Sequence, residues 1–324
     1  GTWALIQAKV LMDIYGADCK GHAVLADFDL VAANSGGSIV AAGLISDITL
    51  GDILQLFMIE SNRKAMFRAI PWYKKSLLRV FGVGPQFSTE GKLKGLTEIL
   101  HGPATRVLDG LEIGNRNKQA IRFLITAYDY DRDRAAYFRS DRNSPAANFP
   151  RGANPLSVIE AVHASSTAPV NYFDEPAAFG DRRYWDGGMA GLNNPILAAV
   201  VEALAYDTAP TDIGVLSIGT GNDFRPTKGP CASPELLHPK EPTGVADSIR
   251  KAASAAVADP PDTASFIAYR MLGGALPQAA GALPVAPTSV VRLNPLIRPT
   301  IQNRQWQRPG NVSADEFVKL AEMD

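Results

Sequence analysis

The pattern of apolar and polar positions predicts a chain in which strands and helices alternate. Residues 5–16 place apolar side chains near helical spacing and end at a glycine, which is typical of a helix and its C-terminal stop. Short apolar runs bounded by glycine, proline or charged turns predict strands. The expected strands lie within residues 30–33, 121–138 (as a hairpin), 182–186, 212–219 and 289–297. The expected helices lie within 36–45, 50–81, 88–100, 157–168 (closed by Pro169) and 196–205. This alternation predicts an α/β fold, a three-layer sandwich around a mostly parallel central sheet.

A length of 324 residues allows one large α/β domain or two smaller ones, and the alternation of strands and helices favours a single domain over residues 1–324. No internal repeat is visible in the sequence. Residues 225–287 differ from the rest in being rich in proline and alanine, with an Ala-rich helix expected around 251–257. This excursion is either a lid over a site or an ordinary connection, and the sequence leaves both interpretations open.

Composition narrows the class of protein. The chain has 324 residues, 46% of them hydrophobic, which is enough for a sizeable core. A formal net charge of −1 gives no electrostatic reason to expect a nucleic acid partner. The two cysteines, Cys19 and Cys231, are too few for a disulfide framework or a structural zinc site, which favours a reducing, cytoplasmic compartment. No apolar run approaches the roughly 18 residues that a membrane span needs.

The stretch FDLVAANSGGSIVAAGLI, residues 28–45, predicts a strand, a tight turn and a helix around Ser35. A serine at such a turn is lifted clear of the sheet and faces the unpaired N–H groups of the following helix. The pattern G-x-S-x-G describes this elbow, and Ala33 stands here in place of the first glycine. Ser35 is therefore the candidate nucleophile, with the backbone N–H of Gly36 as a candidate oxyanion donor. The alternative is a glycine-rich turn in which Ser35 only caps the helix.

A serine nucleophile needs a base within hydrogen-bond reach. Asp186 is the best placed carboxylate, since it follows an apolar strand and precedes two glycines, although an Asx-turn role would give the same pattern. A Ser-His-Asp triad in the α/β-hydrolase order would require His238, which lies in the proline-rich stretch. His163 lies inside an expected helix, where a structural role is favoured.

Several segments in a fixed order carry a resemblance to a known family. They are FDLVAANSGGSIVAAGL, STEGKLKGLTEILHG, AVHASSTAPVNYF, YWDGGMAGLNNP and LSIGTG, which together span roughly residues 1–221. In this order they resemble the patatin-like phospholipases, lipid acyl hydrolases that use a Ser-Asp dyad in place of a triad. The resemblance implies a patatin-like fold, with Ser35 as the nucleophile and Asp186 as its base.

The resemblance also implies the reaction and its partners. Ser35 would form an acyl-enzyme, backbone N–H groups of Gly1 and Gly36 would hold the oxyanion, and no metal or cofactor is required. The basic residue that often follows the family's glycine loop is replaced here by Thr2 and Trp3. The implied substrate is a fatty acyl ester of a phospholipid or galactolipid, met by peripheral contact with a membrane or micelle surface.

Three other functions stay open at this point. A soluble carboxylesterase or thioesterase would share the dyad and differ in its acyl pocket. A triad hydrolase would depend on His238, and a lipid-binding module would lack catalysis.

We also expect the native protein to extend upstream of Gly1. The family's first strand lies inside the sheet and leads into its glycine loop, so an apolar β-type run ending in further glycines is expected immediately before Gly1. Intact-mass measurement with N-terminal sequencing tests this expectation.

Overall fold

The structure is a computed structural model that describes residues 2–70, 85–148, 155–169, 172–221, 244, 260–274, 289–295, 300–302 and 305–307. Gly1, His238 and the helix expected around 251–257 lie outside these residues, and so does most of the 225–287 excursion, of which residue 244 and residues 260–274 are described. The single-domain assignment and the lid therefore stay predictions.

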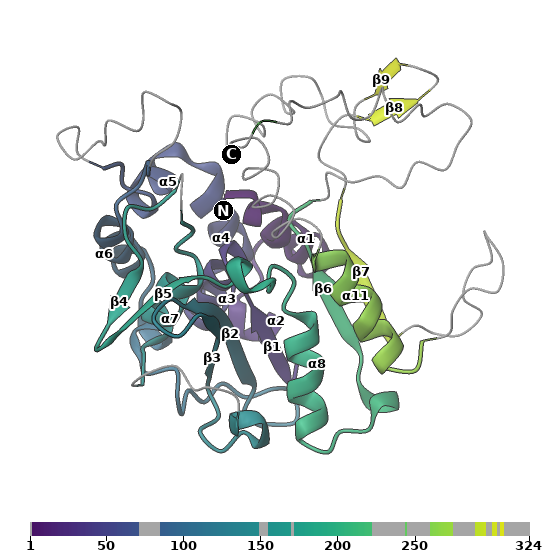
Figure 1. Cartoon of the computed structure of the whole chain (residues 1–324). Coiled ribbons are helices and arrows are strands. Elements are labelled where there is room, and N and C mark those ends of the chain that lie inside the picture. The colour runs from purple at the N-terminus through teal and green to yellow at the C-terminus, as the bar shows by residue number, and fades with distance from the viewer. Residues whose placement is uncertain are drawn as a thin grey trace.

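The described chain alternates strands and helices, which confirms the α/β sandwich class (Figure 1). A five-stranded sheet contains β1 (Leu30–Ala33), β2 (Arg122–Asp129), β3 (Arg134–Arg139), β4 (Ala177–Phe179) and β5 (Arg182–Asp186). Strands β6 (Val215–Ile218) and β7 (Val290–Leu293) form a second, parallel pair, and β8 (Thr300–Gln302) pairs with β9 (Gln305–Gln307).

Strand directions are mixed among the described residues. β1 and β2 are parallel, as are β6 and β7, whereas β3 and β5 both run antiparallel to β2 and β4 runs antiparallel to β5. The β2–β3 pair is the hairpin expected from residues 121–138, because a short charged turn can join only antiparallel strands.

Helices cover the sheet on both sides. They are α1 (Leu5–Tyr15), α2 (Gly21–Leu25), α3 (Gly36–Ile45), α4 (Leu50–Met58), α5 (Glu60–Met66), α6 (Thr89–Ile99), α7 (Val158–Ser165), α8 (Ile196–Ala205) and α11 (Pro260–Met271). Short 3-10 turns lie at η1 (Thr2–Ala4), η4 (Gly102–Thr105), η5 (Pro145–Asn148), η6 (Gly187–Ala190) and η7 (Pro210–Asp212). In Figure 1, α8 lies in front of β1, and α2 and α3 lie behind it.

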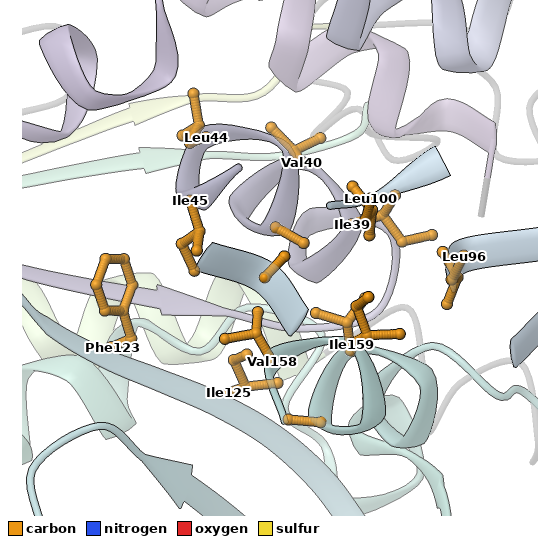
Figure 2. Close-up of a cluster of buried hydrophobic side chains, with 14 of the residues drawn as sticks. Ile39, Val40, Leu44, Ile45, Leu96, Leu100, Phe123, Ile125, Val158 and Ile159 are labelled. Carbon is orange, nitrogen blue, oxygen red and sulfur yellow. The ribbon is translucent and has the colours of Figure 1, made fainter. Parts of the chain in front are cut away.

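Helix α3 is the centre of the main core. Nine of its ten residues are buried, as its small and branched apolar composition predicts. Figure 2 shows its side chains together with those of α6, α7 and β2. The residues in contact there include Ile39, Val40, Leu44, Ile45, Leu96, Leu100, Phe123, Ile125, Val158 and Ile159. The helix that follows the Ser35 elbow is therefore held by three other elements.

Two expected helices differ from the structure at their ends. The pattern over residues 50–81 predicts helical spacing without a break, but α4 ends at Met58 and α5 begins at Glu60. The guanidinium of Arg63 donates to the carbonyls of Phe57 and Met58, which satisfies the end of α4 and stabilises the break. Helix α7 starts at a capping box on Ser157 and ends at Ser165, several residues before the proline that was expected to close it.

Candidate active site

Ser35 lies at the turn between β1 and α3. Its backbone has φ 51° and ψ −130°, an uncommon conformation for a residue with a side chain. Such a conformation costs of order 1–3 kcal/mol and persists only where surrounding contacts hold it. Here the Ser35 N–H donates to Ser165 Oγ at 3.0 Å, and Ser38 Oγ donates to the Ser35 carbonyl at 2.6 Å. The sequence-predicted elbow is present and is held at both ends of residue 35.

β1 and β5 lie end to end along one edge of β2. The Phe123 N–H donates to Ser140 Oγ, and the Phe123 carbonyl accepts from the N–H of Ser140, which directly follows β3. The Arg122 N–H donates to the carbonyl of Asp29, which directly precedes β1, and the Tyr130 N–H donates to the carbonyl of Arg183 in β5. Successive residues of a strand form their backbone hydrogen bonds at opposite edges of that strand. β1 and β5 therefore share the edge of β2 that β3 does not occupy.

The register brings the two strand ends together. Ala33 pairs with Ile125, and Asp186 pairs with Ala127, only two residues further along β2. β1 approaches this point from one direction and β5 from the other. Ser35, two residues beyond Ala33, and Asp186 therefore lie at the junction between the strands.

Asp186 is buried and bonded on its backbone and on one carboxylate oxygen. Its N–H donates to the Thr167 carbonyl at 2.7 Å. Oδ1 accepts from the Gly188 N–H at 2.8 Å and from Asn34 Nδ2 at 3.1 Å. Both of these side-chain hydrogen bonds, which come from described residues, reach Oδ1 and not Oδ2.

Asn34 connects the elbow to Asp186 through its side-chain amide, a contact that the sequence motifs do not predict. Thr126 Oγ1 donates to Asn34 Oδ1 at 2.8 Å. This contact fixes the orientation of the amide, so that its NH₂ group faces the Asp186 carboxylate. Asn34 is 6% exposed, and its position directly before the candidate serine is the signal that could have drawn attention to it.

The two glycines after Asp186 leave room for this network. A Cβ atom on Gly187 would lie 2.3 Å from Asn34 Oδ1, and one on Gly188 would lie 2.5 Å from Asn193 Oδ1. Neither distance is compatible with a side chain. The space that the Asp-Gly-Gly pattern predicts around the aspartate is thus occupied by the amides of Asn34 and Asn193.

Comparison with known proteins identifies the family of this chain. The family model for patatin-like phospholipases matches residues 1–200, which include the elbow and Asp186. The chain belongs to the patatin-like phospholipase family. A cGAMP-activated phospholipase of Pseudomonas aeruginosa (strain BWHPSA011 / Pa011) is 29% identical over 223 residues, which are 68% of this chain. The chain spans about 60% of the length of that relative.

In this patatin-like chain Gly36 is the first residue of α3, so its N–H is among those that a helix leaves unpaired at its start. Gly36 is buried beside Ser35 at the positive end of the helix dipole. Gly1, the second expected donor, lies outside the described residues.

The described histidines have other contacts. His163 is buried in α7 with its ring edge-on to Phe179, and burial, with a smaller contribution from the Lys92 charge, holds its pKa well below the usual value. His22 Nε2 contacts the Ile45 carbonyl, and His101 Nδ1 contacts that of Ile99. No recorded bond between described residues joins a histidine to Ser35 or Asp186, and His238 lies outside them.

Two kinds of feature are absent from the described part of the patatin-like chain. Those residues contain no group of three or more His, Cys, Asp or Glu side chains that would suit a metal ion. None of the helices described is long and apolar enough to cross a membrane.

Proposed function

We propose that this chain is a lipid acyl hydrolase of the phospholipase A type that uses Ser35 as nucleophile and Asp186 as general base. The observation that supports it most directly is the hydrogen bond between Asp186 and Asn34, the residue next to Ser35. Family membership supports the reaction class, and the meeting of β1 and β5 on β2 supports the choice of residues.

The proposed reaction has two steps. Asp186 Oδ2 takes the proton of the Ser35 hydroxyl while Oγ bonds to the ester carbonyl carbon, and the alcohol then leaves with that proton. In the second step Asp186 takes a proton from water as the water oxygen attacks the acyl-enzyme carbonyl, and the Ser35 oxygen then leaves with that proton as the fatty acid is released. The N–H groups of Gly36 and Gly1 are the proposed donors to the oxyanion in both steps.

The proposed substrate is a fatty acyl ester of a phospholipid or galactolipid at a membrane or micelle surface. We place the protein in the cytoplasm, in peripheral contact with the membrane, on the basis of its cysteine content and family. The scheme assigns no step to a metal or cofactor.

A fluorophosphonate probe tests the proposal. Incubation of the purified chain with the probe is expected to add one adduct mass, and peptide mapping is expected to place it on Ser35. Absence of the adduct under conditions where a known serine hydrolase reacts would favour a lipid-binding module. A second arm compares hydrolysis of a short-chain ester below and above its critical micelle concentration. A rate that does not rise with micelle formation would favour a soluble carboxylesterase or thioesterase.

Each assay is run with and without cGAMP. The relative from Pseudomonas aeruginosa is named as cGAMP-activated, and we propose that the same class of ligand acts on the protein to which this chain belongs. Labelling that appears only with cGAMP would support this proposal, and equal labelling in both conditions would contradict it while leaving the dyad in place.

Asn34→Ala is expected to lower kcat about tenfold, because a hydrogen bond to a carboxylate contributes roughly 1.5–3 kcal/mol and holds Asp186 in position. Asn34→Asp keeps the shape but places a second carboxylate against Asp186, so it is expected to lower kcat further. Steady-state rates on a monomeric ester provide the measurement. If Asn34→Asp is as active as Asn34→Ala, the amide does not act on Asp186 as described.

A further inference from the structure

Lys92 is a charged side chain buried beneath the candidate site. It extends from α6, is fully buried, and lies with Nζ 4.5 Å from the centre of the Phe173 ring. Burial of an ammonium group is unfavourable unless polar groups compensate for the lost water. An apolar residue of similar length would fill the same space without that cost. The role of Lys92 must therefore lie in the hydrogen bonds that its ammonium group makes.

The ammonium bonds to the end of α7. Lys92 Nζ donates to the His163 carbonyl at 3.1 Å and to Thr167 Oγ1 at 2.9 Å, and Thr167 Oγ1 donates to the same carbonyl at 2.6 Å. The C-terminal carbonyls of a helix carry partial negative charge, so a cation is favourable at this position.

The segment that Lys92 holds, residues 163–167, contacts both members of the proposed dyad. Ser165 Oγ accepts the backbone N–H of Ser35, and the Thr167 carbonyl accepts the backbone N–H of Asp186. The three alternate residues of the segment thus bond to the lysine, the elbow and the strand end that bears the aspartate.

We propose that Lys92 is a positioning residue for the hydrolysis reaction, which fixes the 163–167 segment and through it the separation of Ser35 from Asp186. The inference rests on the proposed function of that pair. The hydrogen bonds that Lys92 makes to described residues go to His163 and Thr167 and not to Ser35 or Asp186, so its expected effect is on the rate of the chemical steps and not on the affinity for substrate.

Electrostatics agrees with this geometry. Burial lowers the pKa of Lys92 well below its usual value, while the Asp186 carboxylate acts in the opposite direction. The second titratable group that faces the ammonium is His163, whose pKa is itself lowered, first by burial and then by Lys92. The carboxylate that favours the charged lysine is therefore the one proposed as the general base.

Lys92→Met is compared with Lys94→Met, which makes the same change on the exposed side of the same helix. Lys92→Met is expected to lower kcat on a monomeric ester about tenfold or more with KM within twofold, because a small misplacement of reacting groups is costly. The rate of fluorophosphonate labelling at Ser35 is expected to fall in parallel. A folded Lys92→Met protein with kcat and labelling within twofold of Lys94→Met would overturn the proposal.

A second pair of variants tests the positioning role of Lys92 if Lys92→Met does not fold. Thr167→Ser keeps the hydroxyl that accepts from Lys92, and Thr167→Val keeps the shape without it. The valine variant is expected to have a kcat at least fivefold below that of the serine variant. Equal values, or the reverse order, would overturn the proposal. Wild-type protein that is not labelled at Ser35 would instead count against the proposed function, so labelling of the wild type is measured first.

Discussion

Ser35→Ala is expected to abolish ester hydrolysis, with a fall of about 10⁴-fold or more in kcat, because no other group can form the acyl-enzyme. The fold is expected to persist, since the bonds that hold the elbow use the backbone of residue 35 and not its hydroxyl. Initial rates on a phospholipid and on a monomeric ester measure the loss, and circular dichroism with a thermal melt checks the fold.

Ser46→Ala serves as the matched control for this experiment. Ser46 lies at the other end of α3, and its hydroxyl is buried without a hydrogen-bond partner among the described residues. Removal of that oxygen is expected to leave the rate unchanged. Hydrolysis that persists in Ser35→Ala at more than a few per cent of the wild-type rate would sink the assignment of the nucleophile.

Asp186→Asn is expected to lower kcat by about 10²–10⁴-fold, the usual contribution of a general base. The amide oxygen can still accept from Asn34 and Gly188, so the network around it is preserved, but an NH₂ group replaces the oxygen that would take the proton. The measurement is the pre-steady-state rate of Ser35 acylation by a chromogenic ester.

Two control variants distinguish the loss of a general base from a general loss of stability. Asp129→Asn changes another buried aspartate on β2 that bonds to a turn, and it is expected to affect stability more than rate. His238→Ala is expected to stay within a few-fold of wild type. If His238→Ala instead loses as much activity as Ser35→Ala, the base is a histidine and the triad interpretation is correct.

The sequence predicted the parts of the site that depend on local chemistry. The apolar run before Ser35 and the small residues after it predict the strand, turn and helix that the structure has. The Asp-Gly-Gly pattern likewise predicts that Asp186 ends a strand and needs space around it. In both places the backbone conformation is determined by residues within a few positions of the site.

The parts that the sequence did not predict depend on contacts between distant elements. Lys92 lies within the helix expected over residues 88–100, and its burial arises from Phe173 and the end of α7, which come more than 70 residues later. The role of Asn34 likewise requires Thr126 and Asp186 to be in place. The end of α4 at Met58 carries no glycine or proline signal and depends on the side chain of Arg63.

The meeting of β1 and β5 on one edge of β2 also bears on how the protein folds. Asn34 and Asp186 are 152 positions apart, so the loop closure that joins them is among the slow, entropically costly steps of folding. The helices and the β2–β3 hairpin form from neighbouring residues and can be complete before β5 docks. Any compact, largely helical intermediate of this chain would therefore be inactive. The time at which activity appears during refolding would show when β5 docks on β2.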